Sequence, residues 1–310
     1  MTFWQSLFCT YVGVFLNGFI QLHAQQVIDS TFTYEVIQPA YNYNQGPLIA
    51  IDEYHNNDMS VGNRMFPLIN VLKNDGYRIE AWNKPLTQEL NGVNTLVIIG
   101  ALHYSNVNNW KLPTPEAMSD EEIDQLLNWI QNGGNLLLVA DHMPFPGAVK
   151  KLSTKLGVEW YNGFVIDSIN WGLSIFSRRE KTLKAHPLLE GRNIDEKINW
   201  VATYYGSGFQ LKDNTIKGLF SFNNPDVISY QTTEAWRMFP DTPTIPSNLL
   251  FQAAVFKKGK GRVAIIGEAS LFSAQLVGKD KQPVGINFNN QNQNLQFVLN
   301  LFHWLSGAID

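Results

Sequence analysis

The stretch "NLLLVADHMPFPGA", residues 135–148, decides the fold. Five apolar residues, 136–140, lead directly into Asp141 and His142, and prolines and a glycine follow at once. A short, continuous apolar run that is bounded by turn residues is typical of a strand buried on both faces. The stretch therefore predicts a buried strand that ends on two titratable side chains.

Strands and helices alternate on both sides of this stretch. Strand-like apolar runs lie at 47–52, 95–101, 135–141 and 261–270, and an alternating pattern that is typical of a strand lies at 77–82. Segments with helical spacing lie at 63–76, 119–134, 147–157 and 292–307. Apolar strands that alternate with helices are typical of a parallel sheet with both faces covered. The sequence predicts an α/β fold, an open and mostly parallel sheet with helices on both faces, as in flavodoxin-like proteins.

The middle of the chain breaks this regularity. Residues 160–250 are rich in aromatic residues and in Asn and Pro turns, which indicates antiparallel strands and long loops. We expect an irregular antiparallel insertion there, within one α/β domain over 47–310. Residues 25–46 are polar and are expected to form an extended lead-in.

The first residues are unlike the rest of the chain. Residues 3–22 are apolar and aromatic, which favours a signal peptide over 1–24 that is cut near Ala24. A membrane anchor is the alternative, but polar residues interrupt the run. We expect an exported protein, periplasmic, cell-surface or secreted, with no stable membrane span after cleavage. Since Cys9 is the only cysteine, cleavage would leave no thiol for catalysis or for a disulfide.

The charge of the chain bears on its partners. Lys and Arg number 23 against 27 Asp and Glu, for a net charge of −4, and no extended basic block occurs. This balance excludes nucleic acid as an expected partner.

Titratable and polar residues follow the predicted strands. Ligands of open parallel sheets bind beyond the carboxyl ends of the strands, so these residues form the candidate site. They are Asp52, Glu53, His55, Asn56, Asn57, His103, Asp141, His142, Glu268 and Ser270. Each alone has an ordinary structural interpretation, such as a helix cap. A converging set costs repulsion and desolvation, and therefore predicts a functional pocket.

Two chemistries fit such a pocket. Asp141 or Glu268 would be a general base with His142 or His55 as its partner, which makes these four the candidate catalytic residues. Carboxylates and imidazoles also suit a divalent metal such as zinc or manganese, although no HExxH spacing is present. Ser270 is a weaker candidate nucleophile. A helix that starts near Gly147 would point free amides at an anion.

Aromatic residues give a second indication. Trp160, Trp171, Trp200 and Trp236 lie in or beside the irregular middle and could form a platform for sugar rings, or could simply fill a loop-rich core. The Asn- and Gln-rich segment 287–294 could bind a polar ligand, or could be a solvated loop and helix cap.

The order of these elements also has a familiar counterpart. From "LIAID" through "TLVIIGAL" and "EEIDQLLNWIQNGG" to "NLLLVADHMPFPGA" and "GRVAIIGEASLFSAQ", the chain resembles the class I glutamine amidotransferase-like superfamily. The likeness covers about 47–160 and 255–306. It is greatest to a bacterial branch that lacks the nucleophilic cysteine and is related in fold to domains found with gliding-motility and ABC-transport systems.

The resemblance implies the fold and not the activity. In true amidotransferases a nucleophilic cysteine follows the strand that corresponds to 135–140, and a late segment brings a histidine and a glutamate. Here Asp141 and His142 follow that strand, and the late segment has Glu268 without an adjoining histidine. Glutamine hydrolysis by the family mechanism is therefore excluded.

We expect a hydrolase, metal-dependent or acid/base, that acts on a carbohydrate or another polar extracellular small molecule. The alternative is a non-catalytic ligand- or partner-binding module of an envelope transport or motility system, with an envelope protein as its partner.

Overall fold

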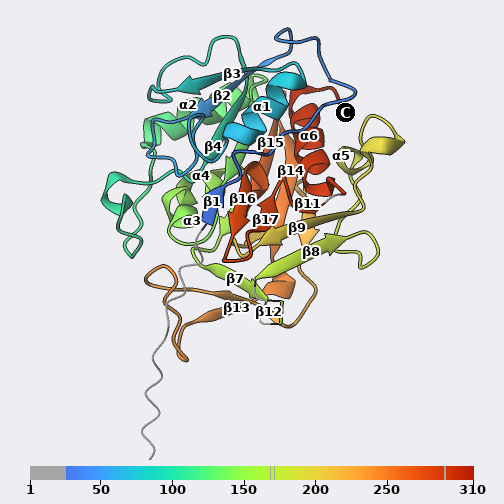
Figure 1. Ribbon diagram of the computed structural model, residues 1–310. Coiled ribbons are helices and arrows are strands. Elements are labelled where there is room, and N and C mark those ends of the chain that lie inside the picture. The colour runs from blue at the N-terminus through green and yellow to red at the C-terminus, as the bar shows by residue number, and fades with distance from the viewer. Residues whose placement is uncertain (1–25, 168, 171, 290) are drawn as a thin grey trace, which may run out of the picture.

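The computed structural model describes residues 26–310 except 168, 171 and 290 (Figure 1). The expected signal peptide and Trp171 lie outside the described residues. A sheet of nine strands forms the centre of the molecule. Its parallel half consists of β3 (Arg78–Trp82), β2 (Leu48–Asp52), β4 (Val93–Ile99), β5 (Asn135–Val139) and β15 (Gly261–Ile266), in that order. The α/β prediction is thus confirmed, and the parallel strand order is that of flavodoxin-like sheets.

The other half of the same sheet is antiparallel. Its strands are β14 (Phe251–Lys258), β10 (Phe209–Leu211), β6 (Val158–Trp160) and β11 (Lys217–Ser221). A tight turn at Gly259 reverses the chain from β14 into β15, so that every strand beyond β15 pairs in the antiparallel sense. The prediction of a mostly parallel sheet therefore holds for only one half of the sheet.

The antiparallel strands expected over 160–250 are present. Some join the central sheet, and others form two small sheets at one end of the molecule (Figure 1). The small sheets contain β7 (Phe164–Asp167), β12 (Val227–Tyr230), β13 (Thr244–Pro246), β8 (Leu173–Ser177) and β9 (Trp200–Tyr204). A third small sheet joins β1 (Gln26–Ile28), β16 (Ala274–Val277) and β17 (Gln282–Gly285).

Helices contact the central sheet on both faces. The helices are α1 (Phe66–Asn74), α2 (Asp120–Gln131), α3 (Phe145–Ala148), α4 (Lys150–Lys155), α5 (Pro187–Glu190) and α6 (Gln293–Ser306). Short 3-10 turns lie at Tyr104–Asn106, Ile194–Glu196, Ser247–Leu249 and Ser270–Phe272. Side chains of α1 and α6 belong to one buried core and those of α2 and α4 to the other. Because strand side chains alternate, Val97 and Ile99 of β4 enter the first core and Ile98 enters the second.

Local sequence explains where the helices begin and end. Ser119 and Glu122 form the expected capping box at the start of α2, and α6 ends at Gly307 with φ 86°. The helix expected over 147–157 is divided into α3 and α4, because Val149 has φ −125° between them. No helix in the described part of the chain is long and apolar enough to cross a membrane.

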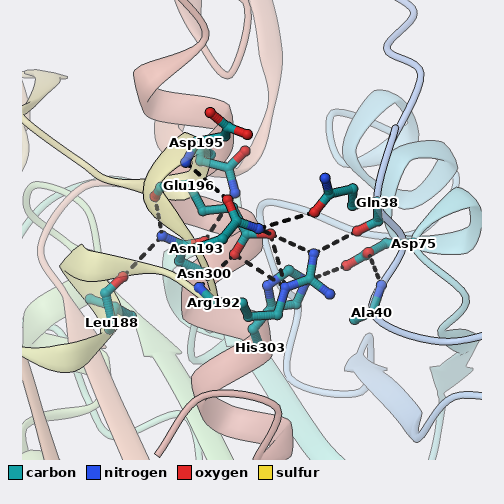
Figure 2. Close-up of polar contacts among 11 residues, drawn as sticks. Gln38, Ala40, Asp75, Leu188, Arg192, Asn193, Asp195, Glu196, Asn300 and His303 are labelled. Atoms are coloured by element: carbon teal, nitrogen blue, oxygen red, sulfur yellow. Dashed lines mark hydrogen bonds and ion pairs between the residues drawn. The ribbon is translucent and has the colours of Figure 1, made fainter.

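A partly buried polar network ties the lead-in segment to the rest of the molecule (Figure 2). The Asp75 carboxylate at the end of α1 accepts a hydrogen bond from the Ala40 amide at 2.7 Å and contacts His303 Nε2 of α6 at 2.7 Å. Arg192 donates to both Glu196 oxygens and to the Gln38 carbonyl. The network therefore holds the lead-in, α1, α6 and part of the insertion together.

Candidate functional site

The carboxyl ends of β2, β4, β5 and β15 lie along one edge of the sheet, as parallel strands require. The loop after β2 crosses the end of β4, where the Asp58 amide donates to the Gly100 carbonyl at 3.0 Å. Gly100 has φ 66°, and a Cβ there would lie 2.9 Å from Cβ of Asp58. The glycine therefore permits the crossing, which carries Asp58 toward β5.

Two carboxyl groups meet at the ends of β5 and β15. These strands are neighbours, with Val139 opposite Ile266, and Asp141 and Glu268 each follow two residues later. Asp141 accepts a hydrogen bond from the His142 amide at 2.8 Å. Glu268 is 1% exposed and accepts from the Ser270 and Leu271 amides at 2.8 and 3.0 Å. We call Asp141 and Glu268 the carboxyl pair.

The carboxyl pair is placed where both groups resist ionisation. Burial raises the pKa of Glu268 to about 8, and the negative charge of Asp141 contributes to that rise. Burial also raises the pKa of Asp141, and the nearby Asp58 carboxylate adds to it. Because two neighbouring carboxyls in a low dielectric cannot both be charged cheaply, the pair retains a proton near neutral pH. The Arg64 guanidinium nitrogen Nη1 is 2.9 Å from Oδ2 of Asp58 and offsets the charge of that carboxylate.

His142 lies beside the carboxyl pair with its tautomer fixed. Its Nδ1 is 2.7 Å from the Met143 carbonyl oxygen, an acceptor, so Nδ1 carries the proton when the ring is neutral. The lone pair is then on Nε2. The ring is 8% exposed, so it borders solvent on a small part of its surface.

Aromatic rings surround His142. Phe164 stacks on the imidazole with centroids 4.3 Å apart, and Trp236 meets it edge-on at 4.7 Å. Trp110 and Phe145 complete the group at 5.6 and 5.9 Å. We call these four rings the aromatic collar. Trp236 is 48% exposed and has φ 64°, an uncommon conformation for a bulky residue, and so presents its ring to solvent beside the carboxyl pair.

A second buried group lies at the end of β2. His55 Nδ1 is 2.9 Å from an Asp52 oxygen, and His55 Nε2 is 3.1 Å from Glu122 of α2. Burial alone would lower the pKa of His55, but the two carboxylates outweigh it and raise the pKa. Hydrogen bonds from Ser119 overcome burial and lower the pKa of Glu122. Both imidazole nitrogens are occupied, so the group joins β2 to α2 and leaves His55 no free nitrogen.

Three other predicted residues lie in the loop after β2. Glu53 accepts a hydrogen bond from the Val61 amide at 2.7 Å, and Asn56 donates to the Leu102 carbonyl at 3.1 Å. The Asn57 side-chain amide is buried without a hydrogen-bond partner. These three residues shape the loop after β2.

His103, Gly147 and Ser270 have local roles. His103 Nδ1 accepts from the Ser105 amide and caps a 3-10 turn. The Gly147 amide donates to Asn162 at 3.2 Å, and α3 begins at Phe145, so this amide is not free for an anion. Ser270 lies against Glu268 through its amide. The structure thus brings Asp141, His142, Glu268 and Ser270 together.

Some residues of the site carry no signal in the sequence. Asp58, Arg64 and Phe164 reach it through pairings that a periodicity does not reveal, and Glu122 was recognisable only as part of a capping box. Among the described residues, no group of three or more His, Cys, Asp or Glu side chains could hold a metal ion. The carboxyl pair and His142 are groups that can donate and accept protons.

Comparison with known proteins gives a likeness in fold to a solved structure. The chain matches no protein-family model, and no curated protein matches it significantly. The mmIFT52 N-terminal domain superposes with a TM-score of 0.57 at 14% identity, over 83% of this chain and 97% of that domain. This likeness shows a shared overall fold, and its identity is too low to transfer a function.

Two further structures are more distant. A ThuA-like protein from Bacteroides uniformis has a TM-score of 0.46 at 12% identity, over 88% of this chain and 94% of that one. PurLQS from Thermotoga maritima has a TM-score of 0.40 at 11% identity, over 83% of this chain and 100% of that one. Scores of this size decide neither fold family nor function.

Proposed function

We propose that this protein is an acid–base hydrolase in which the carboxyl pair and His142 carry the proton transfers. The observation that supports the proposal is the pair itself: two carboxyls at adjacent strand ends, with the pKa of Glu268 raised to about 8. Enzymes retain such groups because a carboxyl that keeps its proton at neutral pH can donate it to a leaving group.

Each residue has a role that its position permits. Asp141 is partly exposed and would face the substrate, while Glu268 is buried behind it and acts as a positioning residue that keeps a proton on the pair. The proton that Glu268 holds would pass to Asp141 and from Asp141 to the leaving oxygen, and Nε2 of His142 would take a proton from the attacking water. The new bond joins the water oxygen to the substrate carbon, and the bond to the leaving oxygen breaks. Solvent then returns the proton from His142 to the pair.

The aromatic collar favours a carbohydrate as the substrate. Trp236 offers a half-exposed ring next to the carboxyl pair, and the apolar face of a sugar stacks well on such a ring. Hydrolysis of a glycosidic bond uses two acid–base groups on opposite sides of the bond. The proposed substrate is therefore a glycan.

The proposal places the chain in the class I amidotransferase-like superfamily by fold, and outside it by chemistry. The parallel strand order and the position of β5 support the fold assignment. Asp141 and His142 occupy the end of β5, and the single cysteine of the sequence is Cys9. Glutamine hydrolysis through a thiol is not part of the proposal.

A non-catalytic binding module is the second candidate, with a polar ligand or an envelope protein as its partner. One observation favours it: both oxygens of Glu268 accept backbone hydrogen bonds from its own loop, as in a purely structural cap. In that case the carboxyl pair would stabilise its loop and the aromatic collar would bind the ligand.

Turnover of a glycan panel by matched variants distinguishes the two candidates. Asp141→Asn and Glu268→Gln should each lower kcat by about a hundredfold or more. Glu116→Gln is the control, because Glu116 also accepts two backbone amides, from Lys151 and Leu152, away from the site. Loss of activity in all three variants alike, or no turnover by the wild-type protein, would favour the binding module.

Export is part of the proposal and rests on the apolar residues 3–22. Expression of the full chain in a bacterial host, followed by N-terminal sequencing, tests it. A mature chain that begins near residue 25 in the periplasm or medium would support export, and an intact N-terminus in the cytoplasm would contradict it.

A further inference from the structure

The insertion contains a cavity that the strand-end site does not use. Its volume is about 790 Å³, and it lies between the paired strands β8 and β9, the 221–227 segment, and Phe288, Asn289 and Gln291. The two paired strands lie at the edge of the molecule (Figure 1). Neither residue of the carboxyl pair lines this cavity, which we call the insertion groove.

One wall of the insertion groove is aromatic. Trp200 of β9 and Phe288 pack edge to face with centroids 6.0 Å apart. The Trp200 Nε1 donates to the Gln291 side chain at 3.1 Å, which fixes the orientation of the indole. Ile175 of β8 adds an apolar surface that is 51% exposed. A fixed indole beside an exposed apolar patch suits the flat face of a sugar ring.

The rest of the lining is rich in uncharged polar groups. Six of these residues are Ser177, Asn199, Asn223, Asn224, Asn289 and Gln291. Amides and hydroxyls provide both donors and acceptors, which is the combination that hydroxyl-rich ligands require.

The charged residues at the groove already have partners, and the Asp167 carboxylate accepts hydrogen bonds from the Ile169 and Asn170 amides at 2.9 and 2.8 Å. Arg178 donates to the Ile198 and Leu189 carbonyls and pairs with Glu190 at 2.8 Å. Arg179 pairs with Glu180 at 2.9 Å. Because these guanidinium groups have partners, the groove offers little net attraction to an anion, and an uncharged ligand fits it better.

The groove and the carboxyl pair are connected through one strand. β7 begins at Phe164, which stacks on His142, and ends at Asp167, which lines the groove. Four residues of strand span about 10 Å from first to last. A chain of a few sugar rings held in the groove would therefore lie close to the aromatic collar.

We propose that the insertion groove binds a neutral oligosaccharide, with Trp200 as its stacking platform. The groove's ligand class follows from its own lining and does not depend on whether the carboxyl pair is catalytic. A cavity of this size is within the range of small-ligand sites and accommodates a short segment of a glycan chain.

Isothermal titration calorimetry with the full chain tests the proposal. The probes are the tetraoses of cellulose, xylan, mannan, laminarin and chitin. At least one should bind, and Trp200→Ala should weaken that binding by about tenfold or more, since loss of the stacking face removes at least one such interaction. Asp141→Asn should bind the same probe as tightly as the wild-type protein, whether or not the protein is a hydrolase.

Trp236→Ala tests the alternative that the collar holds the sugar, and Phe239→Ala is the matched control, because Phe239 is an exposed ring that does not line the groove. Circular dichroism confirms that each variant is folded. Binding that is lost in Trp236→Ala and kept in Trp200→Ala would overturn the proposal, as would failure of every probe to bind the wild-type protein.

Discussion

Glu268 is held by opposing influences, and burial prevails. The Ser270 and Leu271 amides favour its charged form, while removal from water and the charge of Asp141 raise its pKa to about 8. The consequence is a carboxyl that stays protonated at a pH where an exposed glutamate is charged. A single side chain thus gives the site both its proton and a dependence of stability on pH.

Glu268→Gln should reveal that dependence. In the folded protein the pKa is about 8, against 4.5 as the ordinary value. The folded state therefore binds the proton more tightly, and the wild-type protein loses stability as pH rises from about 5 to about 8. The substituted amide would be neutral throughout, so the variant should gain stability relative to the wild type over this interval. Urea unfolding of both proteins at about pH 5 and about pH 8 measures this gain. A difference in unfolding free energy that is the same at both pH values would contradict the raised pKa.

His55 also makes stability fall as pH rises, but its own contribution to stability is favourable. Its folded pKa is raised above 6.5, so its contribution is complete below about pH 6.5 and is lost as pH rises through the folded pKa. His55→Ala should cost about 3 kcal/mol at pH 6, because it leaves two buried carboxylates without a partner. The cost should shrink toward pH 9 in urea unfolding. His103→Ala, which removes a cap of one turn, should cost about 1 kcal/mol and serves as the control.

The sequence could place residues at strand ends but could not pair them. Asp52, His55, Asp141, His142 and Glu268 were all expected at one edge of the sheet, and the structure places them there. Their division into the carboxyl pair with His142 and the Asp52–His55 group depends on contacts between residues that are far apart in the chain. Glu122, which is 67 residues from His55, decides that His55 is a structural bridge.

At the scale of elements, the start of α2 links a helix cap to the buried histidine. Glu122 Oε2 accepts hydrogen bonds from the Ser119 amide and hydroxyl, and Glu122 Oε1 faces His55. The same carboxylate therefore closes the capping box and joins α2 to β2. Because this carboxylate has both functions, the capping box should contribute more to the free energy of unfolding than an isolated cap does.

Ser119→Ala should lower the free energy of unfolding by about 1 kcal/mol or more. The loss comes from the capping bond to the Glu122 amide and from a freer Glu122 carboxylate beside His55. Thr154→Ala is a suitable control, because that hydroxyl bonds to the Lys150 carbonyl within α4 and caps nothing. Equal stability of the two variants in chemical denaturation would contradict this account.

Elements with strong periodic patterns were predictable, and their exceptions have local causes. The apolar runs at 47–52 and 135–141 and the helix at 292–307 were found close to their true bounds. The helix at 147–157 was not, because a change of backbone direction at Val149 separates α3 from α4. Apolar periodicity continues across such a break and does not reveal it.

At the scale of the whole molecule, the partly buried network of Figure 2 joins segments that lie far apart in the sequence. Arg192 is its centre, since it bonds to Glu196 at 2.9 Å and to the Gln38 carbonyl at 2.5 Å. The lead-in, the insertion and α6 are therefore coupled at the end of the sheet opposite the carboxyl pair.

Arg192→Leu should uncouple these segments. Breaking a partly buried ion pair by removing one partner leaves Glu196 uncompensated and should cost about 3 kcal/mol. Hydrogen exchange should become faster in residues 38–46 and 188–198 while the central strands stay protected. Arg179→Leu removes an ion pair whose arginine is 88% exposed and should change neither quantity much. Similar exchange in both variants would contradict the coupling.

The antiparallel half of the sheet could not be predicted from sequence. Strands β10, β6 and β11 are short; β10 and β11 pair with β14, and β6 pairs with β10, which is far along the chain from it. Pairings of this kind depend on the packed whole and leave no periodic signal within each strand. The parallel half was predictable because its inner strands β2, β4, β5 and β15 are largely buried and therefore apolar, while the edge strand β3 is more exposed.

The retained proton of the carboxyl pair is the central claim, and carbon-13 NMR of the glutamate side-chain carboxyls measures it directly. The Glu268 resonance is assigned by its absence in Glu268→Gln, and the wild-type protein is titrated from about pH 4 to about pH 10. We predict that Glu268 titrates near 8, and that Asp141→Asn lowers its pKa by removing the neighbouring negative charge. Titration of Glu268 near its ordinary value, unchanged in Asp141→Asn, would contradict the account.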